Sequence, residues 1–240
     1  MTKPDKAAQS GKSGSKAKRP SHRRVATQSG ASGKTAEPAV RNAGNRQHDS
    51  LAGNKPLSKR RKRNFPVGEA RRYLEPGPIV LVSSHWQGRD NIMTMGWHCI
   101  LAFAPSLFGC MISSGNHSFD MIRNSGECVI NLPTTALTDI VCRIGNCTGS
   151  AVDKFTEFGL TGSPAEQVSA PIIDQCHAAF ECRLHDDVLV EKYNYFIFEI
   201  VKAHVATRPA HPETLHYTGD GVFMVAGKVI SRRRLFTKVL

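Results

Sequence analysis

A short hydroxyl-rich segment in the middle of the chain combines the residue types that bind an anion. It spans residues 113–118 and holds three serines, one glycine and one histidine: Ser113, Ser114, Gly115, His117 and Ser118. The serines offer hydroxyl donors, the glycine lets the backbone approach a ligand, and a helix predicted to begin at Ser118 leaves amide N–H groups unpaired. Such a helix start favours a phosphate or a carboxylate, and His117 could add partial positive charge. An ordinary capped turn between a strand and a helix explains the same pattern, so both interpretations are kept.

A second group of candidate residues lies upstream, in the segment from Asn91 to Trp97. Asn91 and Thr94 can hydrogen-bond the edge of a heterocycle, and Met93 and Met95 are soft, polarisable packing partners. Trp97 also suits a core or interface position.

Lys154 is a third candidate, because no other Lys or Arg occurs between Arg143 and Arg183. It could contact a phosphate, although an isolated lysine also suits a solvated surface position.

Several familiar kinds of active site are not supported. No G-x-S-x-G elbow occurs, the histidines form no recognisable triad, and no G-x-G-x-x-G follows a predicted strand. The acids are scattered singly, and the cysteines lack the usual spacing of a structural zinc site. We therefore predict no catalytic proton-transfer residue and no metal ligand.

The elements that must position these residues are mostly strands. Buried or alternating apolar runs predict strands at 79–82, 93–103, 107–112, 127–132, 178–185, 195–205 and 222–230. Short helices are predicted after Ser118 with a stop at Gly126, from Thr134 or Thr135 to Gly145, and around 153–158. A turn is expected over His85–Asp90, and Ala179, Glu181, Arg183 and His185 are expected on a wet strand face. About seven strands with few helices predict a closed or nearly closed antiparallel barrel.

The basic charge is concentrated before this barrel. The chain of 240 residues carries a net charge of +12, but residues 1–64 hold 17 Lys or Arg and three acids, leaving 15 basic and 17 acidic residues in 65–240. Residues 1–64 are too poor in apolar side chains to offset ordering entropy, so we expect a disordered tail followed by one domain over 65–240. The run Lys59–Arg63 would contact polyanions non-specifically. A solubilising tail and an organelle transit peptide are alternatives.

The cysteines and the hydropathy bear on the compartment. Seven cysteines, an odd number, lie partly inside predicted strands and indicate buried thiols in a reducing, cytoplasmic setting rather than a disulfide framework. No apolar run approaches the roughly 20 residues that a membrane-spanning helix needs, so no membrane contact is predicted.

An ordered set of strings along the chain resembles the flavin reductase-like FMN-binding split-barrel family, in particular the flavoredoxin group. The strings are Asn91-Ile-Met-Thr-Met-Gly-Trp97, Ser113 to Ser118, Cys128-Val-Ile-Asn-Leu-Pro133, Asp153-Lys-Phe155 with Gly159-Leu160, and His216 to Asp220 ahead of Val222 to Gly227. They cover roughly residues 75–230. The resemblance implies a mainly β, antiparallel split β-barrel with a few short helices, a homodimer, and FMN bound near the dimer interface.

The resemblance also implies cofactor contacts. The isoalloxazine would lie against Asn91, Met93, Thr94 and Met95, and the ribityl and phosphate groups near Ser113, His117 and Ser118, with Asn131 and Lys154 as further contacts. The implied chemistry is hydride transfer from NADH or NADPH to flavin N5, as in an NAD(P)H:flavin reductase or a flavoredoxin-like electron carrier. Rival hypotheses are a related split-barrel oxidase or haem-handling protein, and a non-enzymatic binding protein whose basic tail tethers it to nucleic acid.

Overall fold

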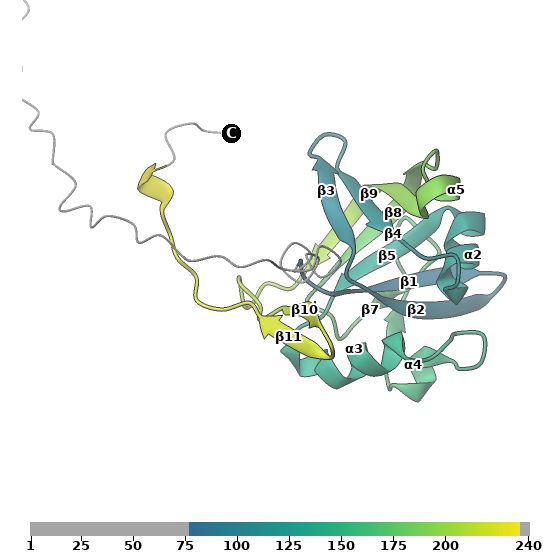
Figure 1. The fold of residues 1–240 in the computed structure, drawn as a ribbon, viewed down its shortest axis with the longest axis horizontal. Helices are drawn as coiled ribbons and strands as arrows, with labels where there is room; N and C mark the ends of the chain where they lie inside the picture. Colours follow the sequence, from purple (N-terminus) through teal and green to yellow (C-terminus); the bar gives the residue numbers. More distant parts are fainter. Residues whose placement is uncertain (1–76, 236–240) are drawn as a thin grey trace, which may run out of the picture. The chain divides into compact units, whose positions relative to one another are not determined.

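The computed structural model describes residues 77–235, all within the second of the two units into which the chain divides, Arg61–Leu240. The predicted disordered tail over 1–64 lies outside the described residues and stays a prediction. The centre of the described part is a seven-stranded antiparallel sheet (Figure 1). In spatial order its strands are β2 (Arg89–Met95), β1 (Val80–Trp86), β5 (Glu127–Leu132), β8 (Ala178–Asp186), β9 (Tyr195–Val205), β4 (Leu107–Met111) and β3 (His98–Ala102).

The two edge strands of this sheet are consecutive in the chain. Only Gly96 and Trp97 separate β2 from β3, so the sheet must curl until its edges approach each other. The Met111 amide donates to the Trp97 carbonyl at 3.0 Å, which extends the β3–β4 pairing into this link. The predicted mainly β, antiparallel split-barrel fold is confirmed.

Short helices and two small hairpins surround the barrel. The helices are α2 (His117–Ser125), α3 (Thr138–Gly145), α4 (Lys154–Glu157) and α5 (Val190–Tyr193), with 3-10 turns η2 (Thr135–Leu137) and η3 (Arg233–Leu235). The hairpins are β6 (Gly162–Ser163) with β7 (Ile172–Ile173), and β10 (Leu215–Gly219) with β11 (Val222–Val225). Helix α2 packs against β1, whereas α3 and α4 lie next to β2 (Figure 1).

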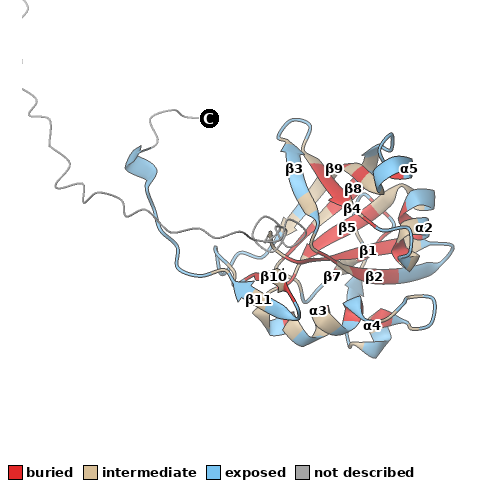
Figure 2. Ribbon diagram, viewed as in Figure 1, coloured by how far each residue is buried: buried red, intermediate tan, exposed pale blue. Residues whose placement is uncertain are grey.

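Strand β1 is apolar on both faces because each face meets a different core. Val80 and Val82 join the cluster inside the barrel, which includes Phe196 and Phe198. Leu81, between them, joins an outer cluster under α3 and the β10–β11 hairpin. The strand is correspondingly buried along most of its length (Figure 2). A continuous apolar run, rather than an alternating one, is what such a two-sided position requires.

The predicted single strand over 93–103 is wrong. The structure breaks it at Gly96, because β2 pairs with β1 whereas β3 pairs with β4, at opposite edges of the sheet. The last predicted strand, 222–230, is also too long, since β11 ends at Val225.

The turn predicted over His85–Asp90 is shorter than expected. Gln87 and Gly88 form it alone, with φ of 50° and 73°, the pattern of a tight type I′ hairpin. His85 and Asp90 belong to the paired strands, and their Nδ1 and Oδ1 atoms lie 2.6 Å apart.

The predicted cap at Ser118 is wrong, whereas Thr134 does hold the N-cap position of η2 and the stop at Gly126 is confirmed by its φ of 69°. Asn116 occupies the N-cap position of α2, and Ser118 is a buried residue of the first turn. The predicted helix after Thr134 begins as the 3-10 turn η2, and Thr134 makes no side-chain capping bond there.

The prediction that Glu181 lies on a solvent-exposed face of β8 is wrong. Glu181 is fully buried. Its Oε1 accepts the Glu166 amide at 3.1 Å and its Oε2 accepts the Gln167 amide at 2.5 Å. His204 Nε2 lies 2.6 Å from the same Oε1. The loop before β7 therefore covers this part of the sheet, which the alternation of β8 alone could not indicate.

Replacing Glu181 with alanine is expected to lower the free energy of unfolding by about 2–3 kcal/mol, because several hydrogen bonds to a charged group are lost together. Urea denaturation at neutral pH measures this change. The control Glu166→Gln removes only an exposed ion pair with Lys202, 2.8 Å long, and should leave the stability nearly unchanged. Equal effects of the two substitutions would contradict the assignment.

The same contacts make the contribution of Glu181 depend on pH. Burial raises the pKa of Glu181, but the hydrogen bonds from His204 and from the two amides outweigh it and hold the pKa below 4.5. A depressed carboxylate pKa stabilises the fold above the unfolded pKa, and this contribution is lost as the pH falls through the folded pKa. The difference between wild type and Glu181→Ala should therefore shrink at acid pH.

All seven cysteines are free thiols, as predicted. Cys110, Cys128 and Cys182 are buried in the barrel interior. Burial raises the pKa of Cys176, outside that cluster, to about 12. Cys176 is therefore a protonated packing group rather than a nucleophile.

Candidate functional site

A cavity of about 490 Å³ lies between β2, the start of α2 and the segment that joins α3 to α4. Its volume is in the range of about 300–1,000 Å³ that is usual for small-molecule sites. We call it the Lys154 cavity. It is lined by Asn91, Met93, Gly115, Asn116, His117, Ser118, Gly145, Asn146, Cys147, Thr148, Gly149 and Lys154.

Lys154 is buried in this cavity without a counter-ion. Its side chain is 4% exposed, and its Nζ donates to the carbonyl oxygens of Ile92 at 2.8 Å and Ile144 at 3.1 Å. No acidic side chain of residues 77–235 forms an ion pair with it. Burial lowers the pKa of Lys154. Because an ammonium has three N–H donors, one is left for a ligand, and an anion would compensate the buried charge.

Asn91 carries a second polar group whose hydrogen bonding is incomplete. Its Nδ2 donates to Ser118 Oγ at 2.8 Å, which leaves the Ser118 hydroxyl hydrogen free to donate elsewhere. The Asn91 Oδ1 atom is buried and has no hydrogen-bond partner among the described residues. Buried acceptors are nearly always paired, so this unpaired oxygen on a residue that lines the cavity is an exception that a donor from a ligand would remove.

Gly149 lets the loop after α3 close over Asn91. A Cβ at this position would overlap the side-chain amide of Asn91. Even Nδ2, the most distant of the three amide atoms, would lie only 2.8 Å from it. The glycine is therefore required by close approach of backbone to side chain rather than by a turn.

The N-terminus of α2 forms the remaining wall. His117 and Ser118 are its first two residues, and Asn116 precedes them. The first-turn amides of a nine-residue helix carry partial positive charge and orient toward anions. Together with Lys154 they make this wall of the cavity a favourable place for a phosphate.

The structure brings five of the nine predicted contacts together here: Asn91, Met93, His117, Ser118 and Lys154. The other four lie outside the lining of this cavity. Thr94 points to the opposite face of β2 and donates to the Val141 carbonyl at 2.7 Å, and Met95 is buried in the barrel core. Ser113 is exposed in the turn before α2.

Asn131 is held entirely by protein groups. Its Nδ2 donates to Ser83 Oγ at 3.0 Å, and its Oδ1 accepts the Ile173 amide at 2.9 Å. This buried asparagine ties β5 to β1 and β7, so its contact with a cofactor stays a prediction.

The sequence analysis missed the loop from Asn146 to Gly149. Its composition, Asn146-Cys-Thr-Gly-Ser150, repeats the small, hydroxyl-rich character of residues 113–118 and could have served as a signal. What the pattern lacks is any indication that the loop folds back onto β2.

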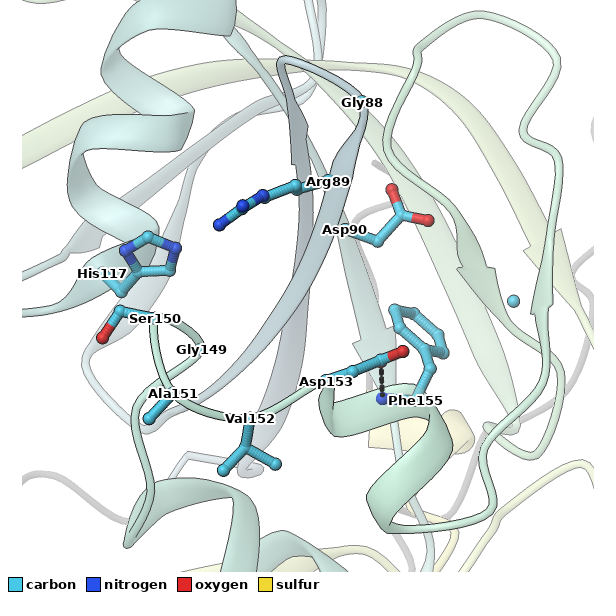
Figure 3. Close-up of a pocket in the computed structure, with 11 residues that line it drawn as sticks. Gly88, Arg89, Asp90, His117, Gly149, Ser150, Ala151, Val152, Asp153 and Phe155 are labelled. Carbon is cyan, nitrogen blue, oxygen red and sulfur yellow. Dashed lines mark hydrogen bonds between the residues drawn. The ribbon is translucent and has the colours of Figure 1, made fainter.

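A second cavity, of about 590 Å³, adjoins the first, because His117 and Gly149 line both. We call it the Arg89 cavity. Its other lining residues are Gly88, Arg89, Asp90, Ser150, Ala151, Val152, Asp153, Phe155 and Gly162 (Figure 3).

The fold and the site together define an antiparallel split-barrel protein with a cavity beside an edge strand that is lined by a buried lysine. Residues 71–225 match the model of the flavin reductase like domain. Because this match covers more than half of the chain, the protein belongs to the flavin reductase-like family, and the predicted resemblance is confirmed.

The chain is also similar to individual proteins. An uncharacterized protein of Archaeoglobus fulgidus is 31% identical over 129 residues, 54% of this chain and 72% of the relative. An FMN-binding domain of a flavin reductases-like enzyme from Shewanella baltica has 29% identity and a TM-score of 0.60, covering 70% of this chain and 95% of that one. Flavoredoxin of Desulfovibrio vulgaris, at 24% identity, shares the fold with a TM-score of 0.62, over 68% of this chain and 93% of that one.

None of the helices within residues 77–235 has the length and apolarity needed to cross a bilayer.

Proposed function

We propose that this protein binds FMN in the Lys154 cavity and works as an oxidoreductase, either an NAD(P)H:flavin reductase or a flavoredoxin-like electron carrier. The observation that carries the proposal is the buried ammonium of Lys154, which only carbonyl oxygens contact in the part of the chain described. Membership of the flavin reductase-like family supports the choice of a flavin as the anion.

The groups in the cavity fit the parts of FMN. A phosphate would take donors from Lys154, from Ser118 and from the first turn of α2. The Asn91 Oδ1 atom is an acceptor, so it suits a ribityl hydroxyl or a ring N–H rather than a phosphate oxygen. Met93 offers an apolar wall for the ring. Thr94, Met95, Ser113 and Asn131 are retained as predicted contacts that the cavity lining does not include.

When bound, FMN would supply hydride and electron transfer between NADH or NADPH and an acceptor. The chain's own contribution is to bind and orient. Lys154 holds the anionic end, and the Asn91–Ser118 hydrogen bond fixes the two side chains that face the cavity. No side chain needs to move a proton for this role, which agrees with the absence of a catalytic triad from the sequence.

Titration of FMN with the purified full chain tests the proposal. Binding should quench flavin fluorescence and give a yellow complex that bleaches on anaerobic addition of NADH or NADPH. Protein that leaves FMN fluorescence unchanged would refute the cofactor. A bound flavin that neither nicotinamide nucleotide reduces would refute only the proposed electron donor.

We propose in addition that the protein is a homodimer. Strand β3 and the residues beside it expose Trp97, Ile100, Leu101 and Phe103 together, and β3 stands out as exposed in Figure 2. Phe103 is 91% exposed, which is unusual for a large aromatic side chain on a free surface. Contact with a second copy would bury this patch.

Phe103→Asp is expected to convert a particle of twice the chain mass into monomers, because a charge placed in an apolar interface stays unpaired. Light scattering coupled to size exclusion measures the mass. The control Val188→Asp changes another exposed apolar residue, outside this patch, and should leave the mass unchanged. A wild-type protein that is monomeric at micromolar concentration would contradict the proposal.

The basic tail and the compartment remain predictions outside the described residues. Removal of residues 1–64 should abolish any salt-sensitive binding to nucleic acid without affecting FMN binding. A cytoplasmic location is proposed on the seven free thiols, which suit a reducing compartment.

A further inference from the structure

A thiol lies beside the buried ammonium in the Lys154 cavity. Cys147 Sγ donates to the carbonyl oxygen of Ile144 at 3.7 Å, and Lys154 Nζ donates to the same oxygen at 3.1 Å. Cys147 is the only cysteine of residues 77–235 that lines this cavity, and it is partly exposed. A small reagent that enters the cavity therefore meets a thiol next to a positive charge.

This setting is typical of reactive cysteines. The thiolate, not the thiol, is the nucleophile, and reactive cysteines are usually partly exposed and close to a lysine, an arginine or a charged histidine. Burial lowers the pKa of Lys154, and electrostatic attraction to Cys147 opposes this lowering. No acidic side chain of residues 77–235 forms an ion pair with Lys154, so no carboxylate competes with the sulfur for this charge.

The other thiols near the sheet lack this combination of access and charge. Cys176 is a protonated packing group, because burial raises its pKa to about 12. Cys99 is exposed, but its Sγ lies 3.2 Å from the Tyr195 hydroxyl rather than beside a cation. Three more cysteines are buried in the barrel interior: Cys110, Cys128 and Cys182.

The loop that carries Cys147 also lies against an unpaired acceptor. Asn91 is 2% exposed, and its Oδ1 atom has no hydrogen-bond partner among the described residues. A Cβ built on Gly149 would lie 2.0 Å from this oxygen, and both residues line the cavity. A hydroxyl donor in the cavity, from a ligand or from a modified thiol, would complete the hydrogen bonding of this oxygen.

We propose that Cys147 is a site of reversible oxidation that competes with the flavin phosphate for the Lys154 cavity. This inference rests on the proposed function. The oxidant is hydrogen peroxide, which forms when free reduced flavin meets dioxygen. A bound flavin shields the thiol, whereas the flavin-free protein exposes it to the peroxide.

The oxidation proceeds in two balanced steps. The Cys147 thiolate attacks one oxygen of hydrogen peroxide, so that an S–O bond forms, the O–O bond breaks and hydroxide leaves with the electron pair. The sulfur is oxidised by two electrons to a sulfenic acid, and the peroxide is reduced. A small thiol such as glutathione then attacks the sulfenic sulfur, which forms a mixed disulfide and releases water. Exchange with a further thiol restores Cys147.

Alkylation of the full chain with iodoacetamide, followed by peptide mass spectrometry, measures the reactivity of each cysteine. Cys147 should react faster than Cys142, which is also partly exposed but lies on α3 outside the lining of the cavity. Saturating FMN and, separately, Lys154→Met should each slow the reaction of Cys147 by about tenfold or more, without slowing that of Cys142. Absence of any of these three differences in a protein that binds FMN would refute the site.

Treatment with hydrogen peroxide and then glutathione tests the competition. It should add one glutathione at Cys147 and weaken FMN binding by about tenfold or more, because the adduct keeps the phosphate from its charge-assisted contacts. Dithiothreitol should reverse both changes. In the control Cys147→Ser, the FMN affinity should be the same before and after the treatment. A loss of affinity that persists in Cys147→Ser would overturn the assignment.

Failure of this inference is distinct from failure of the proposed function. If FMN does not bind to the untreated wild-type protein, the proposed function fails. The alkylation rates of Cys147 in the wild type and in Lys154→Met then decide alone whether the thiol is reactive. If FMN binds and the treated protein binds it equally well, the proposed function stands and the oxidation site is refuted.

Discussion

Replacement of Lys154 by methionine is expected to weaken FMN binding by about 10- to 100-fold while leaving the ligand-free protein as stable as the wild type or more stable. The loss of affinity follows from the removal of a buried charge-assisted hydrogen bond to phosphate. The gain in stability follows because the buried ammonium of Lys154 has carbonyl contacts but no counter-ion among residues 77–235, and a methionine of similar length needs none.

Fluorescence titration and urea denaturation, carried out on the same preparations, measure the two effects. The control Lys192→Met removes an exposed lysine from α5 and should change neither quantity. If Lys154→Met destabilises the free protein strongly and leaves FMN affinity intact, Lys154 is a structural residue and the phosphate lies elsewhere.

The lowered pKa of Lys154 adds a dependence on pH. The phosphate is attracted only by the protonated amine, so FMN affinity should fall as the pH rises through the lowered pKa, before an ordinary lysine titrates at 10.5. The stability of the free protein should change in the opposite sense. The folded pKa lies below the unfolded one, so the cost of charging the buried amine is present at low pH and disappears as the pH rises between them. Lys154→Met should lose both effects.

Gly149→Ala is expected to reduce FMN affinity by about tenfold or more and to lower the free energy of unfolding by about 1–3 kcal/mol. The added methyl group has no room, because the Asn91 amide occupies its place. Relief of this overlap would displace Asn91, break its hydrogen bond to Ser118 and move the loop that closes the cavity.

A double substitution shows whether the overlap is the cause. Asn91→Ala in the Gly149→Ala background should recover part of the lost stability, although Asn91→Ala alone destabilises, so the two effects should not add. The control Gly227→Ala places a methyl group no closer than 4.0 Å to its nearest neighbour and should be neutral. Additive losses for Gly149 and Asn91 would show that they act independently.

The barrel could be predicted from the sequence because its signals are local. Each signal lies within the element that it predicts. The signals are the apolar run at Ile79–Val82, the alternation from Ala178 onward and the helix stop at Gly126. The break at Gly96 could not be predicted, since it depends on which strand pairs with β2 and which with β3. Both halves of the predicted strand are mainly apolar, and only the closure of the sheet separates them.

The site was predictable in part for a related reason. His117, Ser118 and Lys154 were indicated by hydroxyl-rich and isolated basic patterns, and the family resemblance placed them together. The roles of Ser118 and Gly149 follow from the approach of three distant segments to Asn91, which no spacing along the chain encodes. Asn131 belongs to one of the strings that resemble the family, yet its hydrogen bonds are made within the protein.

The proposed contact of Lys154 with a flavin phosphate would make the stability of the folded protein depend on how much flavin is available. The Lys154 Nζ donates to carbonyl groups of β2 and of the end of α3, so the group that we propose to receive the anion lies at the junction of these two elements. By mass action, a ligand present at 100 times its dissociation constant adds about 2.7 kcal/mol to the stability of the native state. A cell short of flavin would then hold more of the unfolded form, and proteolysis would match the amount of this protein to the cofactor available to it.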